Sequence, residues 1–131
     1  DKIQMTTTKI EINNVKSRRI QFDLEERTLI FAKNCIDLCM LMHKSIINNE
    51  LVSQLVRSAT SVGANYREAN DTITEKDFYH RIGICRREAK ECKYWIELVL
   101  HSNVELKEKA LLLIDEALQL TRIFAAISNK K

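Results

Sequence analysis

The chain of 131 residues contains no proline and only two glycines, Gly63 and Gly83. Proline and glycine mark turns, and a sheet protein of this length needs many turns between its short strands. Long helices that are joined by a few short connections need far fewer such turn residues. The sequence therefore predicts an all-α fold in a single domain that is large enough to bury its own core.

Apolar residues recur in steps of three and four along most of the chain, which is the spacing that places side chains on one face of a helix. Four such runs are present. The first consists of Ala32, Cys35, Cys39, Met42 and Ile46. The second consists of Leu55, Ala59, Val62, Tyr66 and Ala69. The third consists of Phe78, Ile82, Cys85, Ala89, Cys92, Ile96 and Val99. The fourth consists of Leu106, Ala110, Leu113, Ala117, Leu120, Phe124 and Ile127.

These runs predict four helices, with bounds at Leu24–Ile47, Glu50–Asn70, Glu75–His101 and Val104–Ser128. Short connections force neighbouring helices to run antiparallel, so the predicted fold is an antiparallel up-down-up-down four-helix bundle made by residues 23–131. Residues 1–22 show no sustained period. We interpret them as an N-terminal arm that is partly tag or flexible, with Met5 as the natural start.

Local signals set the expected ends of these helices. Asp23 is a suitable N-cap for the first helix, because a short carboxylate side chain can accept bonds from free backbone amides. Asn48-Asn49 is the expected break between the first and second helices. Thr74, followed three residues later by Asp77, resembles a capping box at the start of the third helix.

Several predicted helices are apolar on more than one face. In the first, Phe31, Ile36 and Leu38 widen the stripe, and one bundle core cannot absorb so broad a surface. We therefore expect a second buried surface between subunits. The alternative is that these side chains simply lie scattered over an ordinary protein surface.

Charge and cysteine content narrow the function classes. The formal net charge of +3 permits contact with nucleic acid without requiring it. No apolar run approaches a membrane span, and the first 22 residues do not resemble a signal peptide. All four cysteines fall at apolar stripe positions, which favours small core residues in a reducing, cytoplasmic setting over metal ligands. We expect no cofactor and no metal.

A block of polar residues interrupts the apolar pattern of the second and third helices. Its members are Arg57, Ser61, Asn65, Glu68, Glu88 and Glu91. The first four share one side of a helix, and the two later glutamates lie near the middle of the adjacent antiparallel helix. We interpret the block as a structural polar network that fixes helix register or subunit contacts, and a small binding pocket is the alternative. Glu88 and Glu91 lack the paired histidine of a di-metal site, so catalysis by them is the weakest reading.

The third predicted helix also carries a basic stripe. Arg86, Arg87, Lys90 and Lys93 are the candidate nucleic-acid contacts, and an aromatic neighbour could stack on a base. Glutamates alternate with these basic residues, so the alternative is a solvated helix face whose charges form salt bridges with one another. Trp95 is interpreted as a core or interface anchor.

The two polar motifs together resemble the signature of the bacterial 23S rRNA intervening-sequence proteins. The first motif is Arg57-Ser58-Ala59-x-Ser61-Val62-x-x-Asn65-x-x-Glu68-Ala69, and the second consists of Phe78, Ile82, Ile84, Glu88-Ala89, Glu91 and Trp95. The resemblance covers roughly Leu24 to Ile127. It implies a bundle that assembles as a ring, with a homopentamer as the expected state. No biochemical activity is established for most members of this family.

Some members are encoded within insertions in large-subunit ribosomal RNA genes. A related branch resembles the accessory variability protein of diversity-generating retroelements, a basic pentamer that works with a reverse transcriptase and nucleic acid. The chain departs from the family pattern at Glu68-Ala69-Asn70, where many members have Glu-Gly, and it is less basic than the retroelement branch. The resemblance therefore implies fold and assembly more strongly than function.

Taken together, the sequence predicts a non-enzymatic, oligomeric four-helix-bundle protein of the cytoplasm. Its expected partner is RNA or a nucleic-acid-handling protein, contacted through the basic stripe of the third helix. The alternative is a purely structural protein–protein interaction module that binds no nucleic acid.

Overall fold

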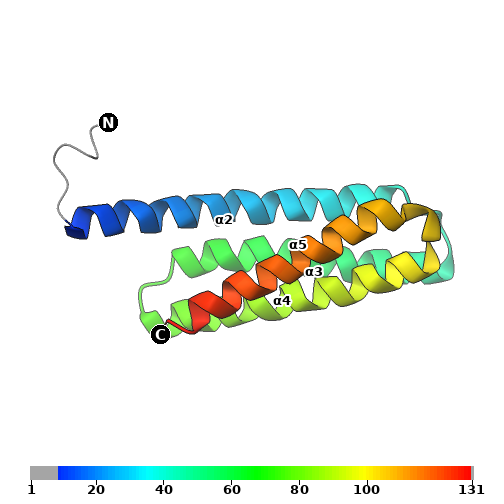
Figure 1. The fold of residues 1–131 in the computed structure, drawn as a ribbon. Coiled ribbons are helices and arrows are strands. Elements are labelled where there is room, and N and C mark those ends of the chain that lie inside the picture. Colours follow the sequence, from blue (N-terminus) through cyan, green and yellow to red (C-terminus); the bar gives the residue numbers. More distant parts are fainter. Residues whose placement is uncertain (1–8, 131) are drawn as a thin grey trace.

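A computed structural model describes the backbone of residues 9–130 and the side chains of residues 23–130. Within residues 9–130, four long helices run back and forth along one axis (Figure 1). They are α2 (Lys9–Met40), α3 (Ile46–Asn70), α4 (Glu75–Ser102) and α5 (Lys107–Ser128), and the single 3₁₀ turn η1 (Val104–Leu106) precedes α5. No strand is present in residues 9–130. The predicted all-α, up-down-up-down four-helix bundle is confirmed, whereas its assembly as a ring stays a prediction.

The first helix differs most from its predicted bounds. Because α2 begins at Lys9, Asp23 lies well inside it, and the prediction that Asp23 caps the N-terminus is wrong. The backbone of residues 9–22, which we expected to form an arm, continues this helix. Met5 lies outside the described residues, and the division of the chain into an arm and a bundle stays a prediction.

The predicted break at Asn48-Asn49 is also wrong, because the chain leaves its first helix at residues 41–45. The amides of Leu41 and Met42 bond to carbonyls three residues back, each at 3.1 Å, which tightens the last turn of α2 and ends it. Ser45 then adopts an extended conformation, and its hydroxyl accepts a bond from the Asn48 amide. Ser45 is thus the N-cap of α3, and Asn48 falls inside the first turn.

The remaining helices closely match their predictions. The N-terminus of α4 is capped by Thr74, whose hydroxyl accepts a bond of 3.1 Å from the Asp77 amide. This helix ends one residue beyond the predicted His101. The fourth predicted helix is divided into the 3₁₀ turn η1 and α5, and the last helical residue is Ser128 as expected.

The core is built from the apolar stripes that the sequence predicts for α3, α4 and η1–α5. Every member of those three runs is buried, except Phe78 and Ile127, which are half-buried against the core. The stripe predicted for the first helix is only partly right, because Ala32 is half-buried and Ile46 is 89% exposed. The actual core positions of α2 in the described residues are Leu24, Thr28, Phe31, Cys35, Leu38 and Cys39.

The helices do not pack equally well against one another. α4 packs closely along its length with both α3 and α5, whereas α2 packs closely with α3 and only sparsely with α5. The α2–α3 approach depends on Gly63, since a Cβ atom there would lie 2.9 Å from Oγ1 of Thr28. A glycine is needed at this one point because a larger residue would push α2 away from α3.

None of the helices in residues 9–130 has an apolar stretch of the length and hydropathy that spanning a bilayer requires.

Candidate nucleic-acid interface

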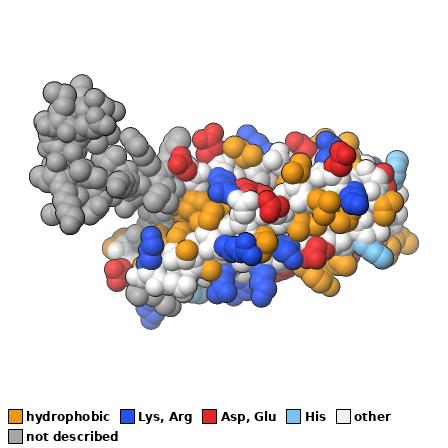
Figure 2. Space-filling model, viewed as in Figure 1, with side chains coloured by type: hydrophobic (Ala, Val, Ile, Leu, Met, Phe, Trp, Pro, Cys, Tyr) orange, Lys and Arg blue, Asp and Glu red, His pale blue; other side chains and the backbone are white. Residues whose placement is uncertain are grey.

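A groove runs along the outside of the bundle between α4 and α5. We call it the α4–α5 groove, and its lining residues are Arg86, Arg87, Lys90, Glu91, Lys93, Tyr94, Glu97, Leu118 and Thr121. All four basic residues predicted to contact nucleic acid therefore line one surface feature. Basic side chains gather over α4 and α5 on the face of the molecule drawn in Figure 2.

The helical spacing of α4 places these basic residues on the outside of the bundle. Cys85, Ala89 and Cys92 are completely buried on the inner face of the helix. Positions one residue after such an inner residue are rotated by about 100° and point away from the core. Arg86, Lys90 and Lys93 occupy those positions, so the apolar stripe that fixes the helix also orients the basic stripe.

Most of the basic residues in the groove form no ion pair among residues 23–130, although Glu91 and Glu97 also line it. The two ion pairs found among residues 23–130 are Lys93 with Glu97, at 3.1 Å, and Arg27 with Glu116, at 2.7 Å. Arg86, Arg87 and Lys90 take part in neither, and all three are exposed. The interleaved glutamates thus neutralise one end of the stripe and leave three cations available to a ligand.

Two aromatic residues stand beside the cations. The Tyr94 ring is 57% exposed and meets the Trp95 ring edge to face, with ring centroids 5.1 Å apart. Trp95 is half-buried against the core, and its indole N–H donates a bond of 3.2 Å to Glu91. Trp95 therefore packs within its own chain and holds Glu91 of the groove lining, while the Tyr94 side chain is largely exposed in the groove.

The polar block does not form the single network that its spacing suggests. Arg57 is exposed and reaches only Gln54 of its own helix, at 3.5 Å, and it pairs with neither Glu88 nor Glu91. Ser61 donates to the carbonyl of Arg57. Within residues 23–130, Glu68 and Glu88 form no side-chain hydrogen bond, and Glu91 is bonded only to the Trp95 indole.

One member of the block does join two helices. Asn65 donates to the Ser61 carbonyl on α3 and accepts a bond of 2.9 Å from the Arg81 guanidinium on α4. The sequence places Asn65 in the polar block but gives no signal for its partner. Arg81 is half-buried, so the bond lies at the edge of the α3–α4 seam.

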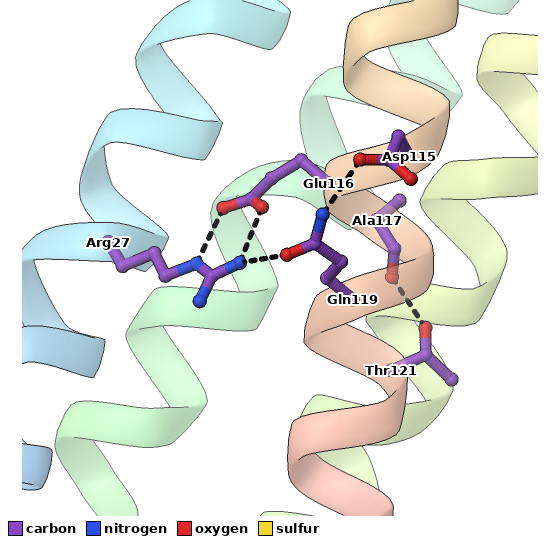
Figure 3. A network of polar contacts seen from close by, with 6 residues as sticks. All are labelled: Arg27, Asp115, Glu116, Ala117, Gln119 and Thr121. Atoms are coloured by element: carbon purple, nitrogen blue, oxygen red, sulfur yellow. Dashed lines mark hydrogen bonds and ion pairs between the residues drawn. The ribbon is translucent and has the colours of Figure 1, made fainter.

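A polar clamp that the sequence did not reveal connects α2 to α5 (Figure 3). Arg27 donates to both carboxylate oxygens of Glu116, at 2.8 and 2.7 Å, and to the side-chain oxygen of Gln119 at 2.9 Å. Gln119 in turn donates to Asp115. The hydrogen bond to Glu116 raises the pKa of Arg27 above its ordinary value. Pairs separated by about ninety residues leave no periodic trace in a sequence.

A second unforeseen contact lies at the end of the bundle that holds residues 41–45 and η1. The side chains of Asn48 and Asn103 are buried and exchange two hydrogen bonds, each of 3.0 Å. Their remaining amide protons go to the carbonyls of His43 and Val99. The predicted helix break at Asn48 hid this role, because a polar residue in a connection is ordinarily solvated.

The four cysteines are free and buried. Burial raises the pKa of Cys39 to about 11 and that of Cys85 to about 12, and it raises the pKa of Cys35 and Cys92 further. Thiols of this kind stay protonated at neutral pH and are poor nucleophiles and poor metal ligands. No cluster of three or more histidine, cysteine or acidic residues suited to a metal ion occurs in the part of the chain that the structure describes.

Comparison with known proteins places this geometry in a family. Residues 21–126 match the family model of the 23S rRNA-intervening sequence protein. A solved structure of a protein with unknown function from the S23 ribosomal protein family of Bacteroides thetaiotaomicron is similar, with 25% sequence identity and a TM-score of 0.71. The alignment covers 79% of this chain and 96% of that one. No curated protein matches the chain. Because the family model spans most of the bundle, the chain belongs to the 23S rRNA-intervening sequence protein family.

Proposed function

We propose that the protein is a non-enzymatic, oligomeric bundle that contacts RNA through the α4–α5 groove. The observation that carries this proposal is the convergence of Arg86, Arg87 and Lys90 on one exposed groove, where no carboxylate pairs with them. Phosphate contacts from such cations dominate the affinity of proteins for nucleic acid. We propose RNA and not DNA because the description of the family names a 23S rRNA-intervening sequence.

Tyr94 adds a second kind of contact to the same groove. An exposed ring beside cations can stack on an unpaired base while the cations hold the flanking phosphates. Each subunit of an oligomer would present one such groove, and repeated weak contacts to one RNA molecule add up through effective concentration. The buried free thiols fit a protein that acts in the cytoplasm, where cysteines stay reduced.

The test is binding of a short fluorescent single-stranded RNA, followed by anisotropy over a series of salt concentrations. The variant Arg87→Gln/Lys90→Gln removes two groove cations, and the control Lys44→Gln/Lys76→Gln removes two exposed cations elsewhere. We expect the groove variant to bind at least about tenfold more weakly at low salt, and its slope of log affinity against log salt to fall by about 2. The control should bind like the wild type.

Two outcomes would contradict the proposal. Equal weakening of the groove variant and the control would mean that the RNA responds to net charge and not to the groove. Absence of binding by the wild type at low salt would leave the alternative, a structural interaction module that binds no nucleic acid.

A further inference from the structure

Two exposed surfaces of the bundle carry opposite charges beside exposed apolar side chains. The first lies between α2 and α3, and we call it the α2–α3 groove. Its lining residues are Thr28, Leu29, Ala32, Lys33, Ile36, Thr60, Gly63, Ala64 and Arg67. Leu29 and Ile36 are 41% and 37% exposed. Small residues along α3 leave room beside these two apolar side chains.

The charge of the α2–α3 groove is entirely positive, because Lys33 and Arg67 line it and no acidic residue does. Their separation follows from the register of the two helices. Thr28 lies against Gly63, and Glu25 accepts a bond from Asn70, so Arg67 is level with the turn at residues 25–28. Lys33 lies about two turns further along α2, or roughly 10 Å away along the axis.

The second surface is an exposed strip on α5, formed by Glu108, Leu111, Leu112 and Asp115. These positions follow the i, i+3, i+4, i+7 spacing with which a helix presents anchors to a groove. Leu111 and Leu112 are 45% and 73% exposed and stand between the two carboxylates. Glu108 and Asp115 are seven residues apart, which again is roughly 10 Å along the helix.

We infer that the α5 strip of a second copy of this chain docks in the α2–α3 groove. Leu111 and Leu112 then cover Leu29 and Ile36, and the two carboxylates meet Lys33 and Arg67 at matching separations. Asp115 already accepts a bond from Gln119 but is exposed, so its carboxylate keeps lone pairs for a partner. Complementary charge at both ends of an apolar contact fixes its direction and register.

The α2–α3 groove and the α5 strip are different surfaces of the same subunit, so the contact is heterologous. A row of subunits joined in this way has one unoccupied α2–α3 groove at one end and one unoccupied α5 strip at the other, until the row closes into a ring. None of the residues that line the α4–α5 groove belongs to either of these two surfaces. The inference rests on the oligomeric state in the proposed function and specifies the surfaces that make it.

The experiment uses light scattering after size-exclusion chromatography on two charge-reversal variants. Lys33→Glu/Arg67→Glu reverses the groove, and Glu108→Lys/Asp115→Lys reverses the strip. Lys44→Glu/Lys76→Glu is the matched control, because both lysines are exposed and lie outside the two surfaces. All three variants change exposed side chains only, and circular dichroism checks that each still folds.

We expect the wild type and the control to elute as an oligomer, and each reversed variant to fall to the 15.3 kDa monomer. An equimolar mixture of the two reversed variants should regain an oligomeric mass, because each then finds an opposite charge on the other. Variants that keep the wild-type mass would overturn this pairing and leave the oligomer itself intact, as would a mixture that stays monomeric. A monomeric wild type would overturn both the pairing and the oligomeric part of the proposed function.

Discussion

α4 and α2 are held in the bundle by different means. Along α4 the contacts are a continuous apolar stripe, from Ile82 to Val99, that packs on both neighbouring helices. α2 also buries apolar side chains, Phe31 and Leu38 among them, but its backbone lies close to α3 and only sparsely approaches α5, to which the Arg27 clamp connects it. Burial of apolar area stabilises a fold more than a partly exposed ion pair does. We therefore expect α4 to contribute more than α2 to the stability of the bundle.

The largest effect is expected at the centre of α4. Ile96 is fully buried, so Ile96→Ala removes apolar contacts and leaves a cavity, which should lower the free energy of unfolding by about 3 kcal/mol. Urea unfolding followed by circular dichroism measures the loss. Ile73→Ala is the control, because Ile73 is entirely exposed and its truncation should change little. A loss below about 1 kcal/mol at Ile96 would show that α4 is not the centre of the core.

A smaller effect is expected at the α2–α3 seam, where the two glycines can be compared. Alanine favours helix over glycine by about 1 kcal/mol, so Gly83→Ala, with open space around its Cβ, should stabilise the protein by up to that amount. Gly63→Ala should instead destabilise it by about 1 kcal/mol, because its Cβ would meet Thr28 and the overpacking outweighs the helix preference.

The same urea unfolding measures both glycine variants. Adding Thr28→Ala to Gly63→Ala should recover most of the loss, since it removes the Oγ1 atom at 2.9 Å. Equal stabilisation by both glycine substitutions would mean that α2 is free to move away from α3.

The smallest effect is expected at the clamp between α2 and α5. Side chains of Arg27 and Glu116 are about a third exposed, so solvent screens their attraction. Arg27→Gln should cost about 0.5 kcal/mol, and a double-mutant cycle with Glu116→Gln isolates the pair. A coupling above about 2 kcal/mol would overturn the comparison, because α2 would then be held by the clamp as firmly as α4 is by its core.

The sequence predicts α3, α4 and α5 well because their stripes obey one spacing and each side chain in them has one role. It fails for the bounds of the first helix and for the start of α3, where Asn48 signals a connection but serves as a buried partner of Asn103, and Ser45 supplies the cap. The basic stripe of the α4–α5 groove could be predicted for the same reason as the apolar stripes, because its residues recur at helical spacing and alternate with the buried positions of α4. The partners of Asn65 and Arg27 were not, because a side chain's spacing along one helix says nothing about which residue faces it from another.

The reciprocal pair of Asn48 and Asn103 also bears on where the chain accepts added residues. It ties the connection before α3 to the one before α5, so extra residues at 41–45 would have to leave two buried amides bonded across the gap. At the other end, the α3–α4 connection carries Ile73 wholly exposed to solvent. A reporter peptide or an affinity tag belongs there, at an exposed tip where insertions are tolerated, because it would leave both grooves and the core undisturbed.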